Sequence, residues 1–133
     1  MFDHLGFYTA GDLRAQGDFY KAILKPLGYH LLQTHIEADG GGRIVFGSGV
    51  ERSPFFVLAK GKPDHWRAEQ KAGLSAMHLA FSAPSKASVD QFHSIGLQRG
   101  ARNNGDPGPR QRGWYGAYLI DADSNGIEAG LYL

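Results

Sequence analysis

His4-Leu5-Gly6-Phe7 and His78-Leu79-Ala80-Phe81 are two copies of one short pattern in a chain of 133 residues. Each copy alternates as a half-buried strand does, with His on one face and Leu and Phe on the other. An amphipathic stretch with a Phe-centred pair follows each copy, Phe19-Tyr20 in the first and Phe92-His93 in the second. The repeated order predicts a duplicated module that carries a histidine at the same position of each half.

Composition narrows the class of protein. A length of 133 residues and a hydrophobic content of 42% fit a single domain over residues 1–133 with a sizeable core. The net charge is +1, from 14 basic and 13 acidic residues, and no basic run stands out, so we expect no nucleic-acid partner. The absence of cysteine excludes disulfides and thiolate catalysis. No apolar stretch approaches the ~20 residues of a membrane span and no signal peptide opens the chain, so we expect a cytoplasmic protein that does not associate with membranes.

The pattern of hydrophobic residues predicts the same order of elements twice. In module 1, about residues 1–60, we expect a helix that begins after Asp12 and ends at Pro26 and Gly28, with strands over 4–9, 29–34, 43–46 and 54–59. A polar linker over about 61–74 separates it from module 2, about residues 75–133. Module 2 is predicted to have a helix over 84–95, a turn-rich connection over 103–109, and strands over 76–82, 115–121 and 127–133. This order indicates an α+β fold with mainly antiparallel sheet.

These motifs resemble the vicinal oxygen chelate superfamily, which includes glyoxalase I, type I extradiol dioxygenases, and fosfomycin- and bleomycin-resistance proteins. The resemblance rests on the two His-Leu-x-Phe strands, on Asp12-Leu13 and Leu27-Gly28, and on the closing segment 121–128. In that closing turn Ala122 and Ser124 replace the family's usual Pro and Gly. The resemblance implies paired βαβββ modules that form an open, cup-shaped, mixed and mainly antiparallel sheet with a metal ion inside the cup.

By the same resemblance, His4, His78 and Glu128 are the metal ligands. Strand parity supports this, because each histidine shares a face with small residues that leave room for an ion and a substrate. A carboxylate in an apolar terminal strand is costly when unpaired, and a cation offsets that cost. The alternative is that each histidine is an ordinary packing or surface residue.

The repeat also predicts a missing fourth ligand. The counterpart of Glu128 in module 1 falls at Phe56 or Val57, and neither side chain binds a metal. The chain therefore departs from the simplest glyoxalase I pattern and keeps two histidines and one carboxylate. Three ligands leave positions open for two adjacent substrate oxygens. Ligand type is compatible with Fe, Mn, Zn or Ni and does not choose among them.

Further residues complete the predicted site. Tyr118 resembles the tyrosine of the extradiol signature that hydrogen-bonds the substrate. The acid–base histidine of that signature would fall near residues 109–111 and is missing from this sequence. The alternative is that Tyr118 packs in the core. Arg110 and Arg112 are candidates to bind an anionic group of the substrate, unless they belong to a solvated loop. Tyr8 is expected to line the cup.

These observations predict a glyoxalase- or dioxygenase-like divalent-metal enzyme that chelates adjacent oxygens of a small organic substrate. The reaction is of lyase, isomerase or oxygenase type and remains open. The alternative is a metal-free protein that binds a small molecule or sequesters a drug. We expect a homodimer by analogy with the family. The sequence does not say whether the two modules pair within one chain or swap between chains. In the swapped arrangement, His4 and His78 of one site would lie on different subunits.

Overall fold

Both modules fold as a strand, a helix and three further strands, as the repeat predicts. The computed structural model describes residues 2–51, 53–61 and 78–133. The first module contains β1 (His4–Tyr8), α1 (Leu13–Leu24), the short 3₁₀ helix η1 (Lys25–Leu27), β2 (His30–Ile36), β3 (Gly42–Gly47) and β4 (Phe55–Lys60). The second contains β5 (His78–Ser82), α2 (Lys86–Gln98), β6 (Arg102–Pro109), the 3₁₀ helix η2 (Gln111–Gly113), β7 (Trp114–Ile120) and β8 (Gly126–Tyr132).

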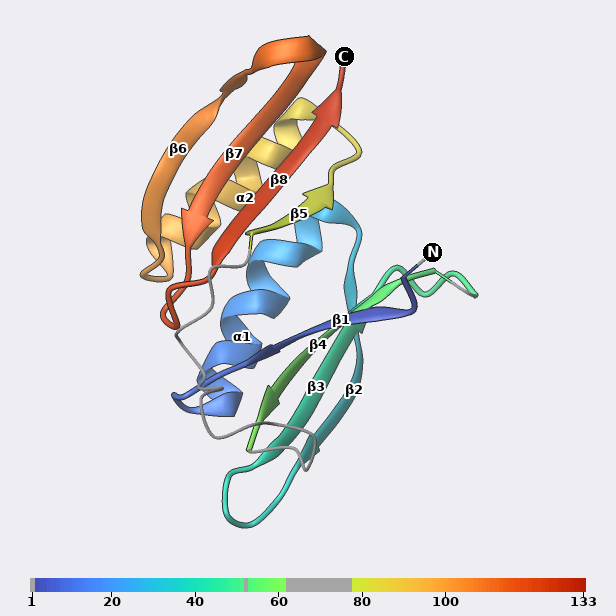
Figure 1. Ribbon diagram of the computed structural model, residues 1–133, viewed down its shortest axis with the longest axis vertical. Helices are drawn as coiled ribbons and strands as arrows, with labels where there is room; N and C mark the ends of the chain where they lie inside the picture. The colour runs from blue at the N-terminus through green and yellow to red at the C-terminus, as the bar shows by residue number, and fades with distance from the viewer. Residues whose placement is uncertain (1, 52, 62–77) are drawn as a thin grey trace.

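Each module forms one four-stranded sheet, and the two sheets have the same topology (Figure 1). The orders are β1-β4-β3-β2 and β5-β8-β7-β6. The first strand of each module runs parallel to the last, and the other pairs are antiparallel. The predicted mixed, mainly antiparallel architecture with open sheets is therefore confirmed. In each sheet the strand that opens the module, β1 with His4 or β5 with His78, is an edge strand.

Side-chain caps define where the helices begin. Asp12 accepts a hydrogen bond from the backbone N–H of Ala15 at 2.7 Å, and Ser85 accepts one from Ser88 at 3.1 Å. Each cap satisfies a donor that the first helical turn leaves without a partner. The first helix ends through η1 at Gly28, whose φ of +83° lies in the left-handed region that glycine adopts most readily.

One hydrophobic core joins the two modules. The helices cover one face of each sheet, and α1 packs against α2. Phe56 of β4 meets Phe81 of β5 edge to face, with 5.8 Å between the ring centroids, and Tyr29 contacts the same Phe81 ring at 5.4 Å. The faces that point away from the helices remain open and carry the polar side chains.

The turn between β7 and β8 is tied to the other module through Asp121. This buried carboxylate accepts hydrogen bonds from the Tyr20 hydroxyl of α1 at 2.5 Å, from the backbone N–H groups of Asp123 and Asn125, and from the Asn125 amide. Ser124 takes a φ of +66°, a conformation that glycine adopts more easily. The serine therefore stands at a left-handed position in this turn.

One sequence expectation was wrong. The segment 103–109 was predicted as a turn-rich connection, yet it lies within β6. Its pairing with β7 shifts register between Asn103 and Gly105 and again between Gly105 and Gly108, so bulges accommodate the Asn, Gly and Pro residues. Because β6 is an edge strand, proline is tolerated there. The predicted linker, about 61–74, lies outside the described residues except for Gly61.

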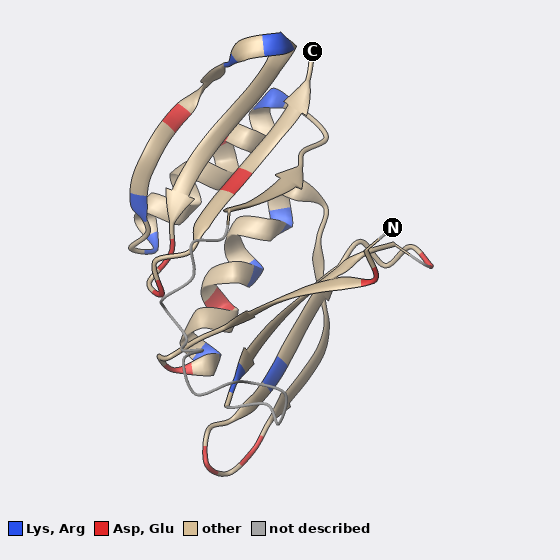
Figure 2. Ribbon diagram, viewed as in Figure 1, with Lys and Arg blue, Asp and Glu red and all other residues tan. Residues whose placement is uncertain are grey.

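Charge is mixed over the described surface. Figure 2 shows basic and acidic positions distributed over both modules, without a broad area of one sign. Among the residues that the structure describes, no helix has the length and apolar character needed to cross a membrane.

Candidate functional site

Glu128 lies at the centre of the open face of the second sheet. In the strand register it stands between Ala80 on β5 and Tyr118 on β7. The neighbouring positions Ile127 and Ala129 point into the core against α2. Alternation along the strands therefore places His78, Tyr118 and Glu128 on one face.

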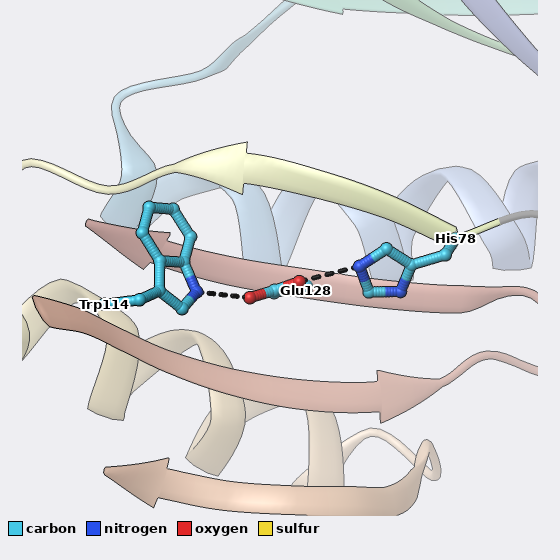
Figure 3. Close-up of polar contacts among 3 residues, drawn as sticks. All are labelled: His78, Trp114 and Glu128. Carbon is cyan, nitrogen blue, oxygen red and sulfur yellow. Dashed lines mark hydrogen bonds and ion pairs between the residues drawn. The ribbon is translucent and has the colours of Figure 1, made fainter. Parts of the chain in front are cut away.

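The carboxylate of Glu128 is buried and has a donor on each oxygen (Figure 3). The His78 Nε2–H donates to Oε2 at 2.7 Å, and the Trp114 indole N–H donates to Oε1 at 2.5 Å. Only 7% of the Glu128 side chain is exposed, whereas 56% of the His78 side chain is exposed. A buried carboxylate at the floor of an open face thus meets a half-exposed imidazole at its edge.

Tyr118 and Arg110 lie beside this pair. The Tyr118 ring is 6.1 Å from the His78 ring, and the Arg110 guanidinium lies 5.2 Å above the Tyr118 ring. Arg110 is held by a hydrogen bond to the backbone oxygen of Asp106. Burial raises the pKa of the Tyr118 hydroxyl, the charge of Glu128 and a hydrogen bond to it raise that pKa further, and Arg110 partly offsets the shift. The hydroxyl therefore stays protonated at neutral pH and can donate.

The donor types around Glu128 are ones that a divalent cation accepts. His78 Nε2 and Glu128 Oε2 lie 2.7 Å apart, which is a hydrogen-bond distance. To bind one ion, the nitrogen would give up its proton and both atoms would turn toward the ion. Imidazole nitrogen with carboxylate oxygen suits several divalent transition metals.

His4 stands apart from this pair within the chain. Its ring stacks on Phe55 at 5.0 Å, and its Nδ1 contacts the Asp3 carboxylate at 2.6 Å. Within the described parts of the chain, no three His, Asp, Glu or Cys side chains form a group that could hold a metal ion. The structure thus brings together two of the three predicted ligands. Both histidines line an apolar hollow of about 440 Å³ between β1 and β5.

Tyr8 lies on the open face of the first sheet. It lines a hollow of about 480 Å³ with polar neighbours that include Gln33, His35 and Arg43. Glu128 does not line this hollow. Arg112, the remaining predicted substrate contact, is an exposed residue of η2 with a φ of +58°.

The strand register shows that Val57 occupies the position in the first sheet that is equivalent to Glu128. Gly6 on β1 pairs with Val57, just as Ala80 on β5 pairs with Glu128. Phe56, the other residue that the sequence left open, is buried in the core. Val57 shares the open face with Tyr8, so an apolar side chain occupies the position equivalent to the carboxylate.

Sequence reasoning missed Trp114. It is the first residue of β7, and its indole contacts Glu128 from the side opposite His78 (Figure 3). The available signal was parity, since Trp114, Gly116 and Tyr118 alternate along one strand and therefore share a face.

Comparisons of structure identify similar folds over nearly the whole chain. A glyoxalase/bleomycin resistance protein from Albidiferax ferrireducens T118 is 26% identical, with a TM-score of 0.75 and 98% of each chain covered. A glyoxalase/bleomycin resistance protein/dioxygenase family enzyme from Burkholderia phytofirmans PsJN is 16% identical, with a TM-score of 0.66 and 98% of each chain covered. The fosfomycin resistance protein FosX from Mesorhizobium loti is 16% identical over 100% of this chain and 92% of that chain, with a TM-score of 0.64. By sequence alone, no protein-family model and no curated protein matches.

Proposed function

We propose that this chain, which has the fold of the vicinal oxygen chelate superfamily, is a divalent-metal-dependent enzyme that acts on a small organic molecule with adjacent oxygens. The observation that carries the proposal is the buried Glu128 carboxylate, whose Oε2 lies 2.7 Å from an imidazole nitrogen on an open sheet face. A buried carboxylate is unfavourable unless its charge is compensated, and a cation held with His78 compensates it fully. The similar proteins include a resistance protein and a dioxygenase family enzyme, which agrees with this class.

We propose that two copies of the chain complete each site. The edge strands β1 and β5 carry His4 and His78, and each sheet has one open face. If β1 of one copy lies beside β5 of the other, His4 reaches the His78–Glu128 pair from the partner subunit. The same arrangement brings the face that carries Tyr8 opposite the face that carries Glu128. A two-fold dimer then contains two equal sites.

The residues on this face have separable roles. Histidine and carboxylate ligands would hold a cation that supplies Lewis acidity toward a substrate oxygen. Tyr118 donates its hydroxyl proton as a hydrogen bond to the substrate oxygen on which negative charge develops. Arg110, fixed above the Tyr118 ring, pairs with an anionic group of the substrate. Val57 and the neighbouring apolar side chains would contact the rest of the molecule.

Elemental analysis of protein purified without chelators tests the proposal. We expect about one equivalent of Fe, Mn, Ni or Zn per chain, and its loss in His78→Ala and in Glu128→Gln. His30→Ala is a matched control, because His30 is an exposed strand histidine of the first sheet. Full metal content in His78→Ala would contradict the ligand assignment.

A second candidate function is supported by one observation. Each oxygen of Glu128 accepts a hydrogen bond from a protein donor, an arrangement that would also satisfy the carboxylate in a metal-free protein that binds a small molecule or sequesters a drug. Such a protein binds its ligand equally well with and without EDTA. For the metal-dependent enzyme, EDTA abolishes binding of a bidentate oxygen chelator such as acetohydroxamate, and added metal restores it.

A further inference from the structure

The Trp114 indole is positioned against the carboxylate of Glu128. Its N–H points along the sheet face toward Oε1, at 2.5 Å, while His78 takes the other oxygen (Figure 3). An indole nitrogen donates and cannot accept, so this contact always presents a hydrogen to the carboxylate. The indole and the imidazole therefore contact different oxygens of the carboxylate, which Tyr118 also contacts.

Two glycines determine where the indole lies. A Cβ at Gly116 would stand 2.7 Å from Trp114 Nε1, and a Cβ at Gly130 would stand 2.3 Å from the indole Cζ2. These residues pair with each other across β7 and β8, so they leave a strip without side chains that the flat ring covers. Tyr132 meets the ring from its outer side, with 4.8 Å between the ring centroids. The glycine strip thus determines where the ring lies, and the exposed Tyr132 only adds a contact at its edge.

We propose that Trp114 is a positioning residue for the metal ligand Glu128; this inference rests on the proposed function. By holding Oε1, the indole fixes the rotation of the carboxylate and leaves Oε2 directed toward the nitrogen of His78. The carboxylate then binds through a single oxygen, which keeps further coordination positions for two substrate oxygens. Without the N–H, the carboxylate can rotate and bind through both oxygens or turn away from His78.

The test measures metal affinity in the metal-free, full-length chain. Trp66→Phe is the reference background, because it leaves Trp114 as the single tryptophan of the sequence. Zn(II) or Mn(II) is titrated into the reference protein and into its Trp114→Phe derivative by calorimetry. We expect the Kd to rise by roughly 10- to 100-fold, as is usual when the partner of a ligand is lost. In the reference protein the Trp114 fluorescence should shift as Zn(II) binds.

Two further variants separate positioning from a general effect on folding. Gly130→Ala leaves the indole intact but displaces it, so its Kd should rise as it does in Trp114→Phe. Tyr132→Leu removes packing against the outer side of the ring while Trp114 keeps its donor, and its Kd should stay within about twofold of the reference.

The outcomes distinguish this inference from the proposed function. Equal affinities in the reference protein and in Trp114→Phe would overturn the role of Trp114 and leave the metal site intact. Equal losses in Trp114→Phe and Tyr132→Leu would overturn it too, because they would indicate packing alone. A wild-type protein that binds neither metal would overturn both proposals. If Trp114→Phe does not fold, the Gly130→Ala titration decides.

Discussion

A mixed dimer tests whether each site is shared between two chains. One chain carries His4→Ala and the other carries His78→Ala, and the two are co-expressed with different tags so that the heterodimer can be purified. Both imidazoles are about half exposed, 53% for His4 and 56% for His78. Truncating an exposed side chain changes the free energy of unfolding by about 0.5 kcal/mol or less, so both chains should fold.

The expected metal content of the heterodimer depends on which chain supplies each histidine of a site. If the sites are shared, one site of the heterodimer lacks both histidines, whereas the other site retains all of its ligands. The heterodimer should therefore bind about one metal ion, half of the wild-type content, while each homodimer variant binds none. If each site is built within one chain, every site of the heterodimer lacks a histidine, and the metal content should be near zero.

Elemental analysis and Mn(II) titration of the tandem-purified heterodimer give the readout. Size-exclusion chromatography with light scattering verifies that all samples are dimers. A heterodimer without metal, next to a wild-type dimer that holds two ions, would refute the shared site. A His4→Ala homodimer with full metal content would refute the role of His4 in either arrangement.

Four further predictions concern stability and the substrate. Tyr20→Phe removes a donor to the buried Asp121 and should lower the free energy of unfolding by about 1–3 kcal/mol in urea titrations. Burial raises the pKa of Tyr20, so above pH ~10 its proton is retained in the folded state and lost from the unfolded state. Above that pH the free energy of unfolding should therefore fall more steeply for the wild type than for Tyr20→Phe. Parallel pH profiles would contradict this. Gly96→Ala would place its Cβ 2.2 Å from a methyl carbon of the buried Leu119. The free energy of unfolding should therefore fall by about 1–3 kcal/mol, measured as a lower melting temperature. An unchanged melting temperature would show that the core has room for the methyl group. Arg110→Gln should weaken binding of phosphonoacetate more than binding of acetohydroxamate, which has no anionic group besides its chelating oxygens. Calorimetry on metal-loaded protein measures both, and equal losses would argue against an anion contact.

The repeat predicted most of the fold because it encodes local geometry. Alternation in the two His-Leu-x-Phe strands predicts which face is buried, and Phe81 is indeed in the core while His78 is exposed. The helix starts at Asp12 and Ser85 follow from side-chain chemistry that acts within a few residues. The strand over 102–109 was missed because bulges at an edge accommodate residues that normally mark a turn.

The candidate site was less predictable because it depends on register and on rotamers. The family resemblance predicted His78 and Glu128 as parts of one site, and the structure brings them into contact. It could not choose between Phe56 and Val57, since that choice depends on which residue pairs with Gly6. Parity alone could place Trp114 on this face, but its contact with the carboxylate depends on two glycines of adjacent strands that pair with each other.

Comparing equivalent positions of the two sheets shows how duplication produced different halves. Tyr118 and Glu128 are directly paired on the second sheet, and their equivalents on the first are the paired residues Val45 and Val57. At these positions the second sheet carries a phenol and a carboxylate, whereas the first carries a small apolar surface of two valines beside the polar hollow that Tyr8 lines. An ion bound by the second sheet would face that apolar surface across the cup. Because a fourth protein ligand is missing there, the open coordination positions would point toward Val57, where the carbon skeleton of a substrate can lie. The lack of a carboxylate at the position of Val57 argues against a glyoxalase I site. It would also leave room for two adjacent substrate oxygens to bind the ion.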